Sequence, residues 1–380
     1  MSPLSPPNQP PLPSPAETKA DKAIAVVDQR FSLVQLLTPT NLHTEQKRFL
    51  NGEIKNPLFS YRPPGVDYDR LIAELRAVDV PRTPIGELLD KKRVESIAKM
   101  RLLQSIGSAA FSEHSKEIYG LPDKEILQDA HDLMGATNPL QPQSDKKQSV
   151  LSSQTVAHNL RDVLSQYNLS DWKVVMTTDI ISGVIVRASI KTVYVHANAV
   201  LNVSRLGPII THEIETHVLT TVNGQAQPLD IFVLGFAGYT RTQEGLAAYN
   251  VESQHPELFH RPARFWSRNA IAVDTAQHAS FREVFEHMKT LQFSDHFSFS
   301  VAAKVKRGLI NTAEHGGFTK DYVYLAGRRD VINFIAAGGA LSDLYIGKIL
   351  LSDLSLLQKQ PWLVEPAVLP GFATKEQSKA

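Results

Sequence analysis

The chain has 380 residues, of which 42% are hydrophobic and 21% are charged, and its formal net charge is +1. This composition is ordinary for a globular protein. The small net charge argues against a general binder of nucleic acid or of membrane surfaces. The chain has no cysteine, so it forms no disulfide, and a metal ion has to take histidine and carboxylate ligands.

The N-terminal part divides into three stretches. Residues 1–18 are rich in proline, which predicts a disordered tail. Between residues 19 and 136 apolar side chains recur at helical spacing, so we expect a helical N-terminal region. Residues 137–150 are polar, contain two prolines and lack periodicity, which predicts a linker.

The region that follows, residues 151–360, is the expected catalytic region. Residues 172–176, 183–188 and 192–195 are rich in β-branched side chains and predict strands, the last two forming a hairpin. We therefore predict a mostly helical α+β fold with a small sheet. A small sheet that leads into a metal-binding helix suits a zincin-like arrangement, in which an edge strand lines the substrate groove. Residues 361–380 are expected to be a C-terminal tail of low order.

Neither end of the chain indicates a membrane protein. The apolar stretch 331–357 is interrupted by charged residues, so no segment is expected to span a membrane. The N-terminus lacks the basic start and apolar core of a signal peptide. A cytoplasmic location is therefore the expectation.

The central motif is His212-Glu213-x-x-x-His217, which lies among apolar residues that indicate a buried helix. Two imidazoles at short spacing can hold one divalent metal ion, and Glu213 can act as a base towards water on that metal. The usual spacing is four residues, which keeps both rings on one face. Five residues turn a regular helix by about 500°, leaving the second ring roughly 140° off the first face. We therefore expect a π-bulge between His212 and His217.

A third ligand should come from a second element, and Glu244 in the segment Gln-Glu-Gly-Leu-Ala (residues 243–247) can supply it. Thr240 or Thr242 can cap a helix here, and Gly245 allows another backbone to come close. Taken alone, each pattern also fits a structural explanation. The first fits a buried helix with hydrogen-bonded side chains, and the second fits an acid in a first helical turn.

These segments together resemble a known family. The matching segments are residues 56–61, 212–217, 223–228, 243–247 and 316–327. In this order they are similar to the QEGLA-motif zinc peptidases, related to the microtubule-associated tyrosine carboxypeptidases, whose bacterial members are labelled flavohemoglobin expression-modulating proteins. The resemblance implies one Zn²⁺ per chain bound by His212, His217 and Glu244, with Glu213 as the catalytic acid/base. Glu215 departs from the family pattern, where a small residue, usually glycine, is expected.

Candidate substrate-binding residues come mainly from the basic segment 307–329, which fits either a solvated cationic face or the recognition of a carboxylate. Lys320 is the first candidate for binding a terminal carboxylate, and Arg241 is the second because it lies three residues before Glu244. The remaining candidates for substrate binding are Asn223, Tyr322 and Arg307. Candidates for stabilising an oxyanion are Tyr322, Tyr324, His315 and Arg307.

The sequence thus predicts a zinc-dependent metallopeptidase. The resemblance points to a carboxypeptidase that removes a residue, with aromatic residues as candidates, from the C-terminus of a peptide or protein. One alternative is a non-haem iron enzyme with two histidines and one carboxylate, which leaves Glu213 without a task. A second alternative is a catalytically idle binding protein, which the unusual Glu215 leaves open. Nucleic acid and membranes are not expected partners, and the oligomeric state is left open.

Overall fold

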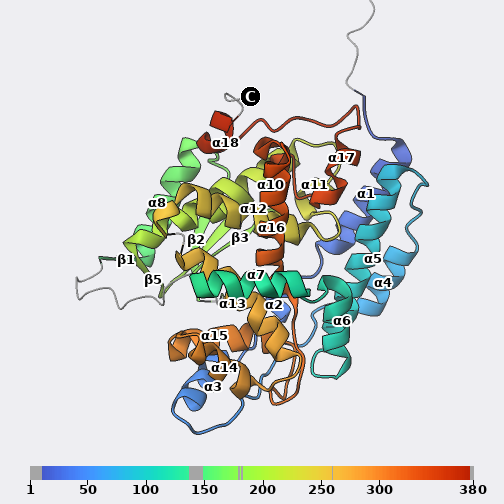
Figure 1. Cartoon of the computed structure of the whole chain (residues 1–380). Coiled ribbons are helices and arrows are strands. Elements are labelled where there is room, and N and C mark those ends of the chain that lie inside the picture. The colour runs from blue at the N-terminus through green and yellow to red at the C-terminus, as the bar shows by residue number, and fades with distance from the viewer. Residues whose placement is uncertain (1–10, 137–148, 179, 181–182, 259, 377–380) are drawn as a thin grey trace, which may run out of the picture.

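The computed structural model describes residues 11–136, 149–178, 180, 183–258 and 260–376 (Figure 1). They form a mostly helical α+β fold with a small sheet, as the sequence predicts. Most of the predicted linker lies outside the described residues. Among those that are described, no helix is long and apolar enough to cross a bilayer.

Helices occupy the N-terminal part, but they begin earlier than expected. Helix α1 starts at Pro15, because the Ser14 hydroxyl accepts from the Glu17 N–H and the Glu17 carboxylate accepts from the Ser14 N–H. The prediction of disorder through residue 18 is therefore wrong from Pro15 onward, and residues 1–10 lie outside the described part. The helices of this region are α1 (Pro15–Asp28), α2 (Leu33–Leu36), α3 (Leu42–Leu50), α4 (Tyr68–Arg76), α5 (Pro84–Gln104), α6 (Ala110–Tyr119) and α7 (Lys124–Ala136).

The sheet is mixed and small. Strand β4 (Thr192–His196) lies in the middle, with β2 (Lys173–Thr177) parallel on one side and β3 (Val184–Arg187) antiparallel on the other. The predicted strands and their hairpin are confirmed. A separate antiparallel pair, β1 (Val150–Ser152) with β5 (Val200–Asn202), was not predicted.

The remaining helices follow the first strand and continue to the C-terminus. The segment that carries the two histidines consists of α9 (Leu206–Ile209), a π-helix (Ile210–Val218) and α10 (Leu219–Gln225). The other helices are α8 (Ser153–Gln166), α11 (Ile231–Leu234), α12 (Tyr239–Gln254), α13 (His260–Ala276), α14 (Phe281–Thr290), α15 (Asp295–Lys306), α16 (Val323–Ala336), α17 (Leu354–Leu357) and α18 (Gly371–Glu376). Short 3₁₀ turns include Ala188–Ile190, Val203–Arg205, Pro256–Leu258, Lys320–Tyr322, Leu341–Tyr345 and Leu351–Asp353.

Buried apolar side chains gather in two clusters. The first contains Leu75 of α4 and Leu89 of α5 together with Val193 of β4 and Val218 of the π-helix. It therefore joins segments from both sides of the predicted linker. The second cluster joins α3 and α7 to α13, α14, α15 and α16, and Phe49 of α3 packs against aromatic rings of α14 and α15 at 4.9–5.5 Å.

The C-terminal strap, defined here as residues 361–376, is not the loose tail that the sequence predicted. It runs across the molecule from α17 to α18, which lies beside α8 (Figure 1). Trp362 is 7% exposed and Ala373 is 1% exposed. The strap therefore contributes apolar surface to the first core cluster.

Two side-chain amides hold the strap through its backbone. The Asn223 amide donates to the Val368 carbonyl at 2.8 Å and accepts from the N–H groups of Ala367 and Val368 at 3.0 Å. The Gln227 amide accepts from the Val364 N–H at 3.0 Å and donates to the Val364 carbonyl at 2.6 Å. The strap is thus bound to the end of the histidine-bearing segment.

Helices α12 and α16 touch backbone to backbone. A Cβ on Gly245 of α12 would lie 2.2 Å from the carbonyl carbon of Gly327, and a Cβ on Gly327 would lie 1.8 Å from the Arg241 carbonyl oxygen. Glycine on both helices therefore permits this approach. The approach brings the N-terminal end of α16, with Lys320 just before it, next to Glu244 of α12.

We expect Gly327→Ala to force α16 away from α12 and to lower the free energy of unfolding by ~1–3 kcal/mol, the usual cost of overpacking. Urea denaturation measures the change. Gly135→Ala in α7 is the matched control, because a Cβ there meets no atom within 4 Å. Its free energy of unfolding should stay within about 0.5 kcal/mol of the wild type, as for other surface substitutions. Equal stability of the two variants would contradict the close crossing.

Candidate metal centre

The π-helix brings the two histidines of the motif together. Residues Ile210–Val218 form this wider helix, so the predicted widening between His212 and His217 is confirmed. In a π-helix residues five apart lie one above the other, since its hydrogen bonds join residues i and i+5. The two imidazole rings have centroids 4.8 Å apart and an interplanar angle of 85°. The Thr216 hydroxyl supports the widened turn by donating to the carbonyl of Thr211, five residues earlier, at 2.8 Å.

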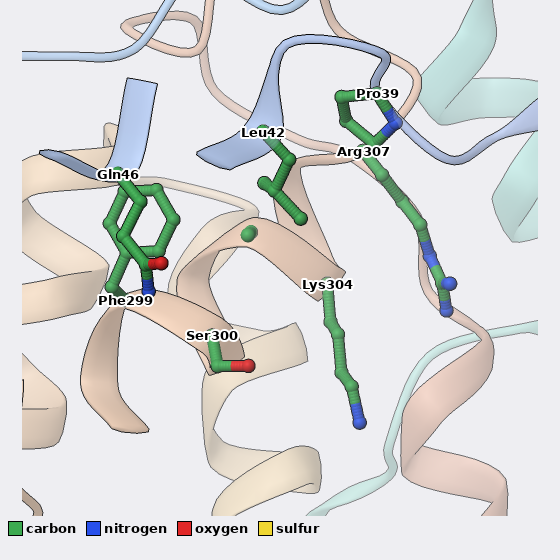
Figure 2. A pocket seen from close by; sticks show the side chains of 8 residues that line it. Pro39, Leu42, Gln46, Phe299, Ser300, Lys304 and Arg307 are labelled. Atoms are coloured by element: carbon green, nitrogen blue, oxygen red, sulfur yellow. The ribbon is translucent and has the colours of Figure 1, made fainter. Parts of the chain in front are cut away.

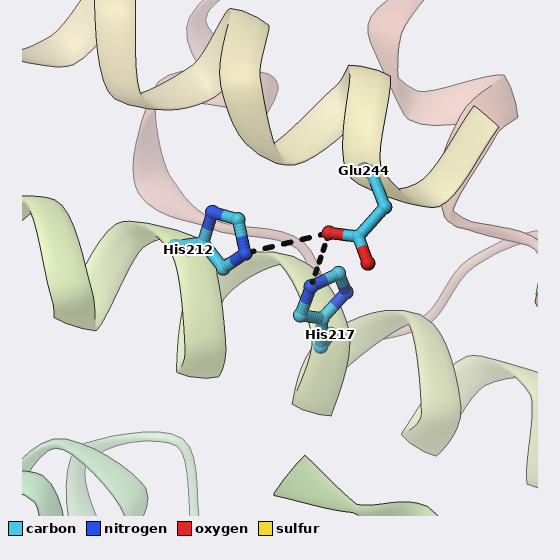
Figure 3. Close-up of side chains that lie close together, drawn as sticks. All are labelled: His212, His217 and Glu244. Atoms are coloured by element: carbon cyan, nitrogen blue, oxygen red, sulfur yellow. Dashed lines mark ion pairs between the residues drawn. The ribbon is translucent and has the colours of Figure 1, made fainter. Parts of the chain in front are cut away.

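Helix α12 supplies the third group. The Oε2 atom of Glu244 lies 3.6 Å from Nε2 of His212 and 3.7 Å from Nε2 of His217 (Figure 3). The three candidate ligand atoms lie within 4.8 Å of one another. In the part of the chain that the structure describes, this is the one group of three histidine or acidic side chains with such spacing. The three residues that the sequence predicted as metal ligands are therefore brought together.

The Oε2 atom of Glu244 fits a metal ligand for a further reason. It is buried, yet it has no hydrogen-bond partner among the described residues. A buried carboxylate oxygen without a partner carries a large free-energy cost unless a cation binds it. Two imidazole nitrogens and one carboxylate oxygen form a donor set used by zinc and also by non-haem iron.

Two neighbours orient the imidazoles. The Oε1 atom of Gln243 lies 3.4 Å from Nδ1 of His217, where it offers an acceptor that can orient the ring and direct Nε2 towards a metal ion. The indole ring of Trp266 stacks against His212 at 6.2 Å and against Tyr324 at 5.2 Å. The motif position of Gln243, directly before Glu244, was the sequence signal for its role. Trp266 stood outside every motif and was missed.

The surroundings of the three ligands shift the pKa values of Glu244 and Glu213 in opposite directions. Burial alone would raise the pKa of Glu244, but the Lys320 ammonium, 3.2 Å from its Oε1, and the two imidazoles hold that pKa well below its usual range. Burial raises the pKa of Glu213 to about 7, an effect that His212 opposes and Glu244 increases. Glu244 is thus an ionised ligand, whereas Glu213 is poised to exchange a proton near neutral pH.

A basic cluster lies beside the centre, defined here as Lys304, Arg307, Lys320 and Arg268. These side chains surround Asp321 closely enough to interact with it electrostatically, and Arg307 forms an ion pair with it at 3.1 Å. Burial lowers the pKa of Lys304 to about 8. The sequence pointed to Arg307 and Lys320 but not to Lys304 or Arg268.

Two cavities share Arg307 as a lining residue. One of about 210 Å³ has Lys304 and Arg307 side by side on its wall (Figure 2). The other, of about 230 Å³, is also lined by Lys320, whose ammonium group contacts Glu244 at 3.2 Å, although none of the three ligands is among its lining residues. The lining residues of the first are Pro39, Leu42, Gln46, Phe299, Ser300, Ala303, Lys304 and Arg307.

Several residues predicted to bind substrate have other partners. The Arg241 guanidinium makes two contacts with the Asp330 carboxylate, at 2.5 and 2.9 Å. The Tyr322 hydroxyl donates to the carbonyl of Tyr119 at 2.5 Å. Asn223 holds the C-terminal strap.

The candidates for oxyanion stabilisation also differ in their distance from the three ligands. His315 is exposed and lies near Glu283, away from the three ligands. Tyr324 lies beside Glu244, and burial together with this carboxylate raises the pKa of the phenol well above its usual value. Of the four candidates, Tyr324 is therefore the neutral hydroxyl donor placed next to the metal centre.

Glu215, the residue that departs from the family pattern, points away from the three ligands. Its Oε1 accepts from the Tyr167 hydroxyl at 3.1 Å, and its Oε2 accepts from the Thr211 hydroxyl at 2.9 Å. The Thr211 hydroxyl also contacts Nε2 of His255 at 3.2 Å. The extra carboxylate therefore braces the rear of the π-helix.

The fold and this centre define a class: an α+β protein whose His-Glu-x-x-x-His helix is completed by a glutamate from a second helix. Comparison with known proteins names the family. The family described as microtubule-associated tyrosine carboxypeptidase matches residues 47–380, and this chain belongs to it.

Individual relatives are more distant. "Microtubule-associated tyrosine carboxypeptidase 1" of Mus musculus is 31% identical over 125 residues, which are 31% of this chain and 26% of that protein. "Putative tyrosine carboxypeptidase MATCAP2" of Mus musculus is 27% identical over 236 residues, which are 59% of this chain and 44% of that protein. The chain spans less than half the length of these curated relatives.

A matched pair of variants distinguishes the metal-binding role of Glu244 from the bracing role of Glu215. Glu244→Gln removes the charge next to both imidazoles. Residues that only orient metal ligands change the affinity by up to ~100-fold, so we expect the loss of a direct ligand to weaken divalent-metal binding at least ~100-fold. Glu215→Gln makes the same chemical change behind the helix and should leave the Kd nearly unaltered. Competition with a chromophoric chelator measures both. Equal weakening would contradict the assignment of Glu215 to a bracing role.

Proposed function

We propose that this chain is a zinc-dependent metallopeptidase that acts as a carboxypeptidase on the C-terminus of a peptide or protein. The observation that carries the proposal is the buried Oε2 of Glu244, which makes no hydrogen bond and faces the Nε2 atoms of His212 and His217 at 3.6 and 3.7 Å. Catalytic zinc sites use three such protein ligands and keep a fourth position open. The names of the relatives support carboxypeptidase activity.

The chain's own residues supply the proton transfers. A zinc ion in this centre would polarise the scissile carbonyl and make water a better nucleophile. Glu213, with its pKa raised to about 7, accepts a proton as the water oxygen bonds to the carbonyl carbon. It passes that proton to the amine nitrogen as the carbon–nitrogen bond breaks. The Tyr324 hydroxyl donates a hydrogen bond to the oxyanion.

The basic cluster supports cleavage at a chain end. A terminal carboxylate needs a cation at a fixed distance from the scissile bond. Lys320 reaches the edge of the centre, and Lys320 and Arg307 both line the cavity of about 230 Å³. Arg241, the second candidate from the sequence, binds Asp330 through two guanidinium nitrogens and lines neither of the two cavities, so it is less suited to the task.

The same cavity suits the side chain of the residue to be removed. Among its lining residues are Phe31, Tyr119, Tyr239 and Phe318. Aromatic walls favour an aromatic side chain through edge and face contacts. We therefore assign a C-terminal aromatic residue to this cavity.

The sheet is consistent with a zincin-like arrangement. Strand β3 is an edge strand that runs antiparallel to β4 and contacts the π-helix. An edge strand offers free backbone groups to an extended peptide. We propose that the substrate backbone adds along β3 with its C-terminus directed to Lys320.

The two alternatives predict different outcomes. A non-haem iron enzyme would contain iron and would give Glu213 no role. A catalytically idle binding protein would hold a metal without hydrolysing peptides. Its main support was Glu215, and the bonds of that side chain to Tyr167 and Thr211 remove this support.

We expect Glu213→Gln to retain one zinc ion per chain and to lower kcat at least ~100-fold, the usual contribution of a general acid–base group. The amide keeps the shape of the side chain but cannot take up the proton. Elemental analysis and peptide hydrolysis measure the two quantities.

The control is the double variant His212→Ala/His217→Ala, which should contain no zinc. Normal turnover by Glu213→Gln would assign the proton transfer to another group. Iron in place of zinc in the wild type would favour the oxygenase alternative.

The mode of cleavage is tested with matched peptides. We expect a peptide with a free C-terminal tyrosine to be cleaved and its C-terminal amide to resist cleavage, because the amide lacks the charge that Lys320 binds. Mass spectrometry of the products measures both. Equal cleavage of the two peptides would identify an endopeptidase.

The role of Lys320 needs its own control. Lys320→Met should raise KM for the free-acid peptide at least ~10-fold, as expected for a lost hydrogen bond to a charged group. Lys359→Met, at an exposed lysine, should leave KM unchanged. Metal content is measured alongside, since Lys320 also contacts Glu244.

A further inference from the structure

Lys306, the last residue of α15, ends in a cage of backbone carbonyls. The residue is 0% exposed. Its Nζ lies 2.5–3.2 Å from the carbonyl oxygens of Ala276, Ala279, Glu314 and Gly316. An ammonium group has three N–H donors and no acceptor, so four converging carbonyls form a complete shell around its charge.

The cage ties together segments that are distant in the chain. Ala276 is the last residue of α13, where carbonyl groups lack partners within the helix and a cation is favoured by the dipole. Ala279 precedes α14, and Glu314 and Gly316 belong to the loop that follows α15. The Gly316 N–H adds a second link by donating to the Ala276 carbonyl at 2.7 Å.

The caged loop leads directly to the basic cluster. Gly316 and Gly317 have φ of 86° and 138°, and a Cβ on Gly317 would lie 2.0 Å from the Val305 carbonyl oxygen. The Gly317 N–H donates to the Ser112 hydroxyl at 2.8 Å. Lys320 follows within a few residues and contacts Glu244 at 3.2 Å. Close packing and hydrogen bonds therefore fix the backbone between the cage and Lys320.

We propose that Lys306 is a positioning residue for Lys320: its caged ammonium group fixes the 314–318 loop and thereby the contact between Lys320 and Glu244. The inference deepens the proposed function in so far as Lys320 acts there. Lys306 itself touches neither Glu244 nor the two histidines, so it acts only through the loop.

Burial lowers the pKa of Lys306 to about 7, and the cage explains how an ammonium group can still occupy this position. Without a cation the four carbonyl dipoles would face one another and lose the donor that Lys306 supplies, and the Ala276 carbonyl would keep only its hydrogen bond from the Gly316 N–H. Rings of backbone carbonyls bind monovalent cations by replacing their hydration shell. The cage emptied by Lys306→Ala should consequently bind a small primary alkylammonium ion.

Hydrogen exchange of the full-length protein tests the positioning role without any need for activity. In Lys306→Ala we expect the amides of residues 316–319 to exchange at least ~10-fold faster, as in a local opening, while those of β4 keep their protection. Propylammonium chloride should restore the protection in a saturable way. Tetramethylammonium, with the same charge but no N–H, should not.

A double-mutant cycle connects the cage to the metal centre. Lys306→Ala and Lys320→Met should each weaken zinc binding ~10-fold, within the range for groups that orient ligands, and the double variant should be no weaker than either one. Chelator competition gives these values even if the wild type hydrolyses no peptide. A failure of the proposed peptidase activity would thus leave this test intact.

Three results would overturn the inference: unchanged exchange at residues 316–319, equally faster exchange over the whole chain, or restoration by tetramethylammonium as well as by propylammonium. Additive losses of zinc affinity in the double variant would also count against it. If Lys306→Ala does not fold, Lys306→Gln serves in its place, because its amide retains two donors. It should give a smaller acceleration at the same amides.

Discussion

The structure depends on one helical constraint: two imidazoles five residues apart must face a single carboxylate. A regular α-helix would turn the second ring roughly 140° away. The π-helix at Ile210–Val218 removes this offset, so His212 and His217 present their Nε2 atoms to the same side. A π-helix packs its backbone less favourably than an α-helix and needs support. Thr216 supports it from within, and Glu215 supports it from behind.

The second requirement is a close approach of the helices around the centre. Glu244 reaches both imidazoles because α12 lies against the π-helix, and Lys320 reaches Glu244 because α16 lies against α12. Gly245 and Gly327 permit that second contact. The glycine in the Gln-Glu-Gly-Leu-Ala segment thus serves the helix crossing, and the glutamate before it serves the metal centre.

The sequence allowed the prediction of features that depend on local spacing. The widened helix follows from the interval between His212 and His217, and the strands follow from runs of β-branched residues. The role of Asn223 could not be predicted, because its partner Val368 is 145 residues away. Lys304 and Lys306 lie two apart on α15 and look alike in the sequence. One faces a cavity and the other a carbonyl cage, a difference set by distant packing.

The way in which Asn223 and Gln227 hold the C-terminal strap has a consequence for how this segment can evolve. Both amides bind main-chain groups of residues 364–368, as a neighbouring β-strand would, so no particular side chain is required at those contacts. Substitutions other than proline at Val364 and Ala367 therefore leave these hydrogen bonds in place, whereas Trp362 and Ala373 are held by their burial in the core. An inserted or deleted residue between Trp362 and Gly371 would instead shift the register of every contact. At these contacts, selection acts on the number of residues more than on their identity.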